Sequence, residues 1–352
     1  MGKTTYLFGA GASCLCLPLV EDIPESLLDF HTLLTDNIPG ESKYENIYNQ
    51  MLQDLEVLIQ NAKTHSSIDT YAKKLFIIHE GNPSPPLTKL KFLLSFCFVY
   101  EQTRYPPDPR YDTFFASILN DSAFSFSGDI RIVSWNYDYQ FEKAHYLYTG
   151  EKSMIETQRQ LPVFPNKENK GFDPTKFAIY KINGTTAFYD PESGHSNNIV
   201  NDLSYGVPYH IDKLDKGTRR KPGVLPKETC QKLVNDFLDL YSRAFSPSET
   251  VLPLLNFAWE STKKGNTNTV LSLAKSAIMG SSILVIIGYS FPFFNRNIDK
   301  QIINSLTTDR KIYIQSTKFE DVASNLESIA PIDHKTLIQV KNIDQFYLPG
   351  EL

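Results

Sequence analysis

The sequence predicts an α/β protein built on a doubly wound parallel sheet with helical insertions. Short apolar segments alternate with segments in which apolar residues recur every three or four positions, the pattern of strands that alternate with helices. Residues 283–287 are apolar throughout, as expected for a central parallel strand covered on both faces. With 352 residues, 41% hydrophobic and 21% charged, the chain has the composition of a globular protein that buries a large core.

The net charge and the cysteine spacing argue against nucleic-acid binding, a disulfide framework and a four-cysteine zinc site. The formal net charge of −5 gives no support for a protein that holds nucleic acid through its phosphates. The chain has no C-x-x-C pair, so neither a disulfide framework nor a four-cysteine zinc site is expected. The cysteines are Cys14, Cys16, Cys97 and Cys230. Because the start lacks a secretory signal and no segment has eighteen consecutive apolar residues, we expect a cytoplasmic protein without membrane contact.

The first predicted strand, residues 4–8, leads into the glycine turn Gly9-Ala10-Gly11-Ala12-Ser13. Glycines at positions 9 and 11 permit a tight turn and let backbone N–H groups approach a ligand closely. A helix is predicted to follow directly, and its positive N-terminal end would face the same anion. The turn therefore predicts a pyrophosphate site, although short glycine pairs are also common in ordinary turns.

A long helical region is predicted from about residue 23 to residue 102. Apolar residues recur there at helical spacing, as at Ile47, Met51 and Leu55, which predicts packing against a core. Glycine and proline break the pattern at 81–86, and 87–100 reads as a strongly buried helix. We expect a single domain over 1–352, with a mostly helical insertion over 23–125 and a loop and helical insertion over 190–280.

The remaining elements continue the alternation. Further strands are predicted over 130–134, 177–182, 283–287, 311–314 and 336–340. Further helices are predicted over 139–148, 230–245 and 256–279. Residues 190–227 are rich in Gly, Pro, Asn and Ser and predict a loop. Its basic patch at 216–221 is interpreted as a solvated face.

Polar clusters follow several of the predicted strands. In open parallel sheets, ligands bind beyond the carboxyl ends of the strands. We therefore expect the clusters to meet at one crevice. They are 9–13, 136–138, Asn183-Gly184, 288–290 and Gln315-Ser316.

This ordered set resembles the sirtuin fold, with a Gly-Ala-Gly-Ala-Ser turn, then an Asn-Tyr-Asp segment, a His-Gly segment and a strand that ends in Gly-x-Ser. The Trp-Asn-Tyr-Asp form at 135–138 and the Gly-Tyr-Ser-Phe-Pro-x-x-Asn form at 288–295 are similar to the sirtuin-like effectors of bacterial antiphage defence. The resemblance spans nearly the whole chain. It implies an NAD⁺ hydrolase that releases nicotinamide and ADP-ribose, forms a homo-oligomer and works with a separate partner, a HerA-like ATPase in preference to an Argonaute-type protein.

The chain departs from the sirtuin pattern in two places. It lacks the two C-x-x-C pairs of the sirtuin zinc ribbon, so we expect no zinc, and the NAD-hydrolysing branch is favoured over a deacylase. Asn183-Gly184 stands where the family has His-Gly. That histidine acts as a general base on the ribose side of the nicotinamide site, and an amide cannot accept a proton near neutral pH. Asn183 can still hydrogen-bond a ribose hydroxyl.

Three explanations for Asn183 stay open: a variant made to trap ligand, a natural binding-only protein, or an enzyme whose base lies elsewhere. Histidines are candidates for such a base, although each is expected to be a surface or structural residue. They are His145, His195 and His210. The alternative function is a non-catalytic NAD or ADP-ribose-binding module that signals through assembly. An ordinary Rossmann dehydrogenase is disfavoured, because Cys14 replaces the third glycine of its fingerprint.

The resemblance also implies residue roles. The catalytic set is Asn136, Asn183 and Asp138, in which Asn136 orients a water or the ribose and Asp138 supports the site or caps the helix that follows. The glycine turn is expected to bind the phosphates of NAD⁺. The loop after 283–287 is expected to contact the ribose or a phosphate. The cofactor-binding set is Gly9, Ala10, Gly11, Ala12, Ser13, Gly288, Ser290 and Asn295, with no metal ligand.

Overall fold

The structure is a computed structural model that describes residues 3–40, 42–82, 84–120, 125–165, 173–189, 222–246, 251–262 and 269–352. Within these ranges its centre is a seven-stranded parallel sheet in the order β11-β10-β9-β1-β4-β6-β5. In chain order, the strands are β1 (Thr4–Phe8), β4 (Ile130–Ser134), β5 (Val163–Phe164), β6 (Ala178–Lys181), β9 (Ile283–Ile287), β10 (Lys311–Gln315) and β11 (Leu337–Val340). The predicted fold class is confirmed.

Strand β1 occupies the middle of this sheet, between β4 and β9. Tyr6 is in register with Ile132 on one side and with Val285 on the other. Every residue of these three strands is buried, as expected for strands in the middle of a parallel sheet that is covered on both faces, and β9 is apolar throughout. The chain builds one half of the sheet outward from β1 and then returns to build the other half from β9. This reversal of strand order is the place where doubly wound sheets bind ligands.

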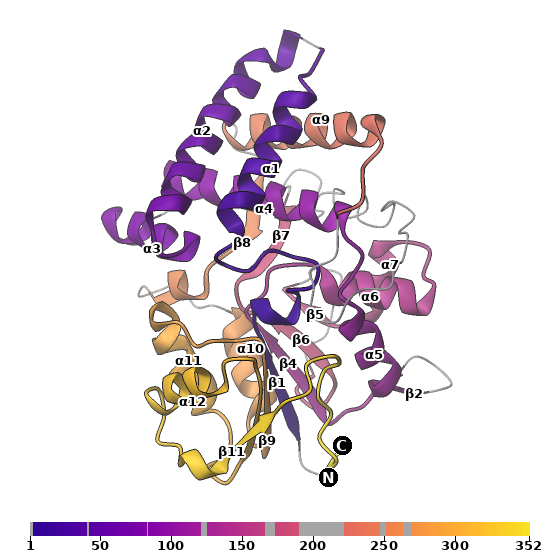
Figure 1. The fold of residues 1–352 in the computed structure, drawn as a ribbon, viewed down its shortest axis with the longest axis vertical. Coiled ribbons are helices and arrows are strands. Elements are labelled where there is room, and N and C mark those ends of the chain that lie inside the picture. The colour runs from indigo at the N-terminus through magenta and orange to yellow at the C-terminus, as the bar shows by residue number, and fades with distance from the viewer. Residues whose placement is uncertain are drawn as a thin grey trace.

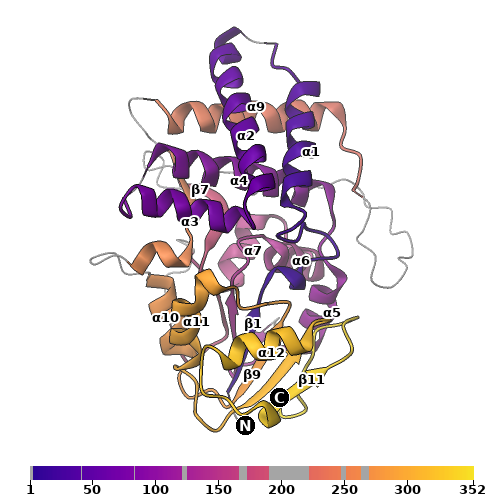
Figure 2. The same cartoon turned by 60° about the vertical axis from the view of Figure 1, so that its left-hand side comes forward.

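Two helical layers cover the faces of the sheet, because successive side chains of a strand point to opposite faces. In β1, Leu7 joins one apolar cluster and Tyr6 and Phe8 join the other. The Leu7 side is covered by α10 (Thr269–Ile278), α11 (Arg296–Ile303) and α12 (Phe319–Glu327). The other side is covered by α5 (Pro109–Ile118) and α6 (Gln140–Thr149). Figures 1 and 2 show these layers in the lower half of the molecule. The short α7 (Met154–Gln160) follows α6.

A separate group of helices lies over the carboxyl ends of the strands (Figure 1). This cap consists of α1 (Ile23–Asp36), α2 (Glu45–Thr64), α3 (Ile68–Ile78), α4 (Pro85–Arg104) and α9 (Lys227–Ala244). It contains an antiparallel pair of strands, β7 (Gly184–Tyr189) and β8 (Leu252–Leu255), and has an apolar core of its own. In that core, Phe96 of α4 packs against Phe188 and Phe237 with ring centroids 5.1 and 4.6 Å apart. The cap therefore forms a roof above the ligand-binding edge of the sheet.

Several elements differ from the predictions. The helix expected directly after the glycine turn is a single 3-10 turn, η1 (Ala10–Ala12), and the first α-helix begins at Ile23. The N–H of Gly11 donates to the carbonyl of Gly288 and not along a helix, and Pro18 interrupts the segment. The short strands β5, β7 and β8 were not predicted. The helix expected over 256–279 is the 3-10 helix η4 (Ala258–Thr262) and then α10.

Three of the predicted features lie in parts of the chain that the structure does not describe. The basic patch at 216–221 and the histidines at 195 and 210 lie outside the described residues. Within the predicted insertion over 23–125, α1 to α4 belong to the cap, whereas α5 packs with α6 beside the sheet. Among the helices that the structure describes, none is both long and apolar enough to cross a membrane.

Candidate functional site

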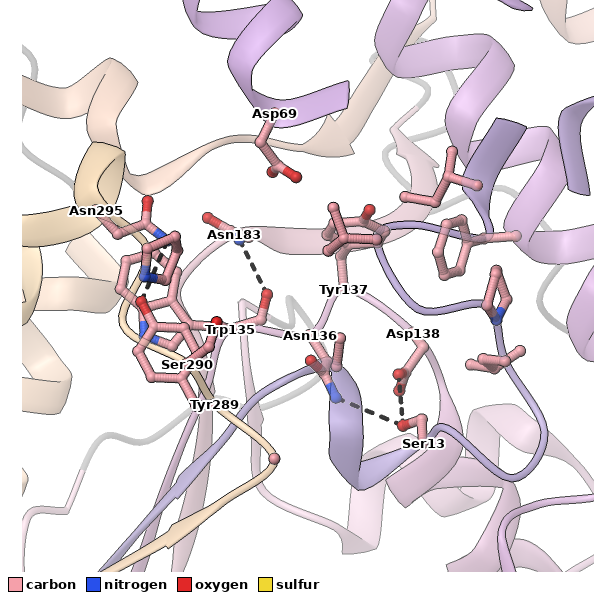
Figure 3. Close-up of a pocket in the computed structure, with 18 of the residues that line it drawn as sticks. Ser13, Asp69, Trp135, Asn136, Tyr137, Asp138, Asn183, Tyr289, Ser290 and Asn295 are labelled. Carbon is pink, nitrogen blue, oxygen red and sulfur yellow. Dashed lines mark hydrogen bonds between the residues drawn. The ribbon is translucent and has the colours of Figure 1, made fainter. Parts of the chain in front are cut away.

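A cavity lies between the sheet and the cap, with about 740 Å³ of empty space when the open solvent at its entrance is included. Its walls come from the loops that follow β1, β4, β6 and β9, together with residues of α1, α3 and α4 (Figure 3). The described lining residues are Ala10, Ser13, Leu17, Pro18, Val20, Ile23, Asp69, Phe98, Trp135, Asn136, Tyr137, Asp138, Asn183, Gly288, Tyr289, Ser290, Pro292, Phe294 and Asn295. The structure thus brings eight of the eleven residues predicted for the site around one space.

The three remaining predicted residues, Gly9, Gly11 and Ala12, lie behind the cavity wall. Both glycines pack against the loop after β9. A Cβ atom at Gly9 would lie 2.6 Å from the carbonyl oxygen of Gly288, and one at Gly11 would lie 2.7 Å from the Cα of Gly288. Gly288 itself has a φ of +60°, and a Cβ there would lie 2.4 Å from the backbone nitrogen of Ala12. The glycines are therefore required for close contact between two backbones.

Most N–H groups of the glycine turn are engaged within the protein. Gly9 and Gly11 donate to the carbonyls of Ile287 and Gly288, at 3.0 and 2.9 Å. The N–H groups of residues 12 and 13 close the 3-10 turn. Among the described residues, the N–H of Ala10 has no such partner, and Ala10 lines the cavity. The turn therefore offers a ligand one backbone donor rather than the row of donors that the glycine pattern suggests.

A buried ion pair behind the turn fixes its carbonyl groups. Arg110 Nη2 donates to the carbonyls of Gly11 and Ala12, each at 3.0 Å, and to Oδ2 of Asp108 at 2.7 Å. Asp108 also accepts from the N–H of Leu15 at 3.3 Å. Sequence reasoning did not find this pair, because an arginine at the start of a helix carries no signal that it reaches a loop about a hundred positions earlier.

Asn136 joins the end of β4 to the glycine turn. Its Nδ2 donates to the carbonyl of Gly9 at 3.0 Å and to Oγ of Ser13 at 3.4 Å. These bonds fix the amide plane and turn Oδ1 away from the protein contacts (Figure 3). Oδ1 accepts no hydrogen bond from the described residues. Asn136 therefore presents a fixed acceptor to a ligand in the cavity.

Asp138 and Ser13 form the floor of the site. Ser13 Oγ donates to Asp138 Oδ2 at 2.9 Å and lies 3.0 Å from the Tyr111 hydroxyl. Asp138 Oδ1 accepts from the N–H of Gln140, the first residue of α6, at 3.0 Å. Burial raises the pKa of Asp138, and the positive charge of Lys181 opposes that rise. The carboxylate thus supports the start of α6 as a capping residue would, and both of its oxygens are occupied.

Asn183 is held at both ends of its side-chain amide. Its Oδ1 accepts from the N–H of Ala258 at 2.9 Å, and its Nδ2 donates to the carbonyl of Trp135 at 2.9 Å. The side chain lines the cavity and is 6% exposed. One Nδ2 hydrogen is left for a ligand. In this position Asn183 ties the β6 loop to the β4 loop and can donate one hydrogen bond, but it accepts no proton.

The loop after β9 contributes an aromatic wall. Tyr289 stacks on Trp135 with ring centroids 5.3 Å apart and an interplanar angle of 11°. The Tyr289 hydroxyl donates to Asp299 at 3.0 Å and accepts from Asn295 Nδ2 at 3.2 Å. Burial raises the pKa of Asp299 to about 8. The predicted residue Ser290 is exposed beside this wall, and its carbonyl accepts from the side chain of Asn325.

The cap contributes Asp69, which sequence reasoning missed. It lies in the first turn of α3, and Figure 3 shows its carboxylate pointing into the cavity above Asn183 and Tyr137. Within the part of the chain that the structure describes, its carboxylate accepts a hydrogen bond only from its own backbone, and burial raises its pKa to about 6. In the sequence Asp69 looks like any acidic residue near a helix N-terminus. Only the folding of the cap over the sheet places it in the site.

Other candidates lie elsewhere. Gln315 does not line the cavity, because its side-chain amide donates to the carbonyls of Asn342 and Gln345. His145 is buried against Phe115 and Phe126, and burial lowers its pKa to about 4. In the described ranges, no group of three or more His, Cys, Asp or Glu side chains is placed to hold a metal ion.

Comparisons with known proteins give distant similarities. The sequence matches no protein-family model and no curated protein sequence. Two solved sirtuin structures are similar to the chain. One is Sir2Tm bound to a propionylated peptide, with a TM-score of 0.36 and 11% identity over 91% of this chain and 84% of that chain. The other comes from work on the structural basis of sirtuin substrate affinity, with a TM-score of 0.34 and 12% identity over 91% and 86%.

Proposed function

We propose that the protein is an NAD⁺ hydrolase that releases nicotinamide and ADP-ribose. The observation that carries the proposal is the meeting of the loops after β1, β4, β6 and β9 around one cavity at the point where strand order reverses. Such a position is the usual ligand site of a doubly wound sheet. The order of the sequence motifs, which resembles that of sirtuins, supports a dinucleotide as the ligand.

The cavity walls suit the parts of NAD⁺. Apolar side chains in the cavity lining suit the faces of its rings, and they include Leu17, Val20, Ile23, Phe98 and Phe294. The Ala10 N–H can donate to a phosphate oxygen, and Asn136 Oδ1 can accept from a ribose hydroxyl or an attacking water. Among the described residues no lysine or arginine lines the cavity. The pyrophosphate would therefore be held by neutral donors.

Hydrolysis breaks the bond between the ribose C1′ and the nicotinamide ring nitrogen. The bonding electrons pass to the ring nitrogen, so the pyridinium leaves as neutral nicotinamide. Positive charge develops on the ribose as in other glycosyl transfers. Water then forms a bond to C1′ and loses a proton to a base. The fixed acceptor of Asn136 lies where it can orient that water.

A non-catalytic NAD or ADP-ribose-binding module is the second candidate. One observation favours it: both ends of the Asn183 amide are bonded to backbone groups, so the position that holds the family's histidine has a structural role here. Such a module binds the ligand in the same cavity and leaves it intact.

The resemblance also supports a wider proposal. The hydrolase would act in the cytoplasm as an effector of antiphage defence, as a homo-oligomer together with a separate HerA-like ATPase. Neither zinc nor another metal is included in this proposal. Copurification of the two proteins, and light scattering of each alone and mixed, test the assembly independently of the activity.

The activity is tested by incubating the purified protein with NAD⁺, alone and with the partner, and measuring nicotinamide by liquid chromatography. Calorimetry measures binding in parallel. We expect nicotinamide release by the wild-type chain and a loss of at least tenfold in Asn136→Ala. Asn61→Ala removes a partly exposed amide that donates to the carbonyl of Val57 within α2 and serves as the control. Saturable binding without release would establish the non-catalytic module, and absence of both would refute the ligand assignment.

A further inference from the structure

We propose that Asp69 is the general base of the site, accepting a proton from the water that attacks the ribose C1′. This inference rests on the proposed function and deepens it, because it assigns to the cap the role that Asn183 cannot fill. It also explains why a site with an amide at that position can remain catalytic.

The other candidate groups are already occupied. Two carboxylates among the described residues line the cavity, Asp69 and Asp138. Both oxygens of Asp138 accept hydrogen bonds, from Ser13 Oγ and from the N–H of Gln140. Asp299 accepts from the hydroxyl of Tyr289 and lies behind the aromatic wall. Asp69 accepts no hydrogen bond from another described residue, so its carboxylate is free to bind a water.

Asp69 also has a fixed position. Lys73 is one turn further along α3, and its Nζ donates to the carbonyl of Phe294 at 2.7 Å. Residues four apart lie on the same face of a helix, so the bond that holds Lys73 to the cavity rim directs Asp69 towards the cavity as well. Phe294 and Asn295 line the cavity. The α3 helix is thus attached to the β9 loop beside the site.

The proposed step balances in atoms and charge. The C1′–N bond breaks and its electrons neutralise the pyridinium. The oxygen of water forms a bond to C1′, and the proton of that water passes to the Asp69 carboxylate. The products are neutral nicotinamide, ADP-ribose and a protonated Asp69, which returns its proton to solvent. A nucleophile that carries no proton, such as azide, does not need the base.

The pKa of Asp69 suits a general base. Burial raises the pKa of Asp69 to about 6, so the side chain is ionised at neutral pH and is more basic than an ordinary carboxylate. The titratable groups that face it are Tyr137 from the β4 loop and Tyr289 from the β9 loop, with Asp138 lining the same cavity. Both tyrosine pKa values are raised well above 10, so these hydroxyls stay neutral. Asp138 and Asp299 also have raised pKa values, so the acidic limb is assigned to Asp69 by its loss in Asp69→Asn.

The test uses Asp69→Asn, which keeps the shape and removes the charge. The control is Asp112→Asn, the same change in the first turn of α5 at an exposed position. For each protein, NAD⁺ affinity is measured by calorimetry, and hydrolysis is measured from pH 5 to 8, with and without azide. We expect Asp69→Asn to lose 100-fold or more of the hydrolysis rate, to bind NAD⁺ within threefold of wild type and to lose the acidic limb. Azide is expected to restore nicotinamide release, giving ADP-ribosyl azide.

The possible outcomes separate the two proposals. Hydrolysis by Asp69→Asn within threefold of wild type overturns the role of Asp69 and leaves the hydrolase intact. Lost hydrolysis with no azide rescue, or with the acidic limb retained, shows a role in positioning and also overturns the base. A wild-type chain that binds NAD⁺ without cleaving it overturns both the hydrolase and its base. A wild-type chain that does not bind NAD⁺ refutes the ligand itself.

Discussion

The hydroxyl of Ser13 donates to Oδ2 of Asp138 at 2.9 Å, which joins the turn after β1 to the start of α6 across 125 positions of sequence. The bond connects the two loops that form the floor of the cavity. It also shows that a serine expected to contact phosphate has its hydroxyl committed within the protein. The stability of the floor and the geometry of the site therefore depend on the same contact.

Replacing Ser13 by alanine should lower the free energy of unfolding by about 1–3 kcal/mol, because it leaves the buried Asp138 oxygen without its donor. The hydrogen bond favours the ionised carboxylate, so the loss should shrink as the pH falls and Asp138 becomes protonated. Denaturant titrations at pH 5 and 7.5 measure it. Ser117→Ala, at an exposed helix position, should change stability by less than about 0.5 kcal/mol. An equal loss for both variants would contradict the prediction.

Gly288→Ala should destabilise the protein by roughly 3 kcal/mol or more, since it combines a positive φ with a clash against Ala12. Gly280 provides a matched control, because it has a φ of +79° and no described atom lies within 4 Å of the place that an added methyl group would take. Gly280→Ala should cost only the strain of the left-handed conformation, about 1 kcal/mol. Thermal denaturation of both variants separates packing from strain. Similar costs would mean that the two loops can move apart freely.

Asp299→Asn should change how stability depends on pH. Burial raises the pKa of Asp299 to about 8, against about 3.9 in an unfolded chain. The stabilisation is complete below the unfolded value and is lost as the pH rises through the folded value. Between pH 5 and 7 the wild type should therefore lose about 1.4 kcal/mol per pH unit relative to Asp299→Asn. Urea titrations across this range test the sign, and a parallel pH dependence in the two proteins would argue against an elevated pKa.

Asn183→Ala should destabilise the loops around the site, because it removes two buried hydrogen bonds, one from the N–H of Ala258 and one to the carbonyl of Trp135. We expect a loss of about 1–3 kcal/mol. Asn183→His can keep only one of the two bonds, since a single ring nitrogen takes the place of the two amide atoms. We expect it to fall between wild type and Asn183→Ala in calorimetric stability. Full stability of the alanine variant would show that these bonds are dispensable.

Much of the sheet could be predicted from sequence because most of its strands have a recognisable pattern in their own residues. The bounds of β1, β4 and β9 agree with the prediction, since short, largely apolar segments that end in polar or glycine clusters are typical of strands covered on both faces. The short strands β5, β7 and β8 do not show this pattern. Their pairing is decided by contacts with neighbouring backbones, which local sequence patterns do not specify.

The sequence by itself determined the fold class and the strand ends that meet at the cavity, because a parallel sheet places the carboxyl ends of its strands along one edge. Only the tertiary structure decided what those residues do. It commits Ser13, Asp138 and Asn183 to hydrogen bonds within the protein, and it brings Asp69 into the site from a helix that precedes β4 by some sixty residues. The reason is physical: a hydrogen bond or a buried charge depends on distances between segments, and local sequence patterns do not encode those distances.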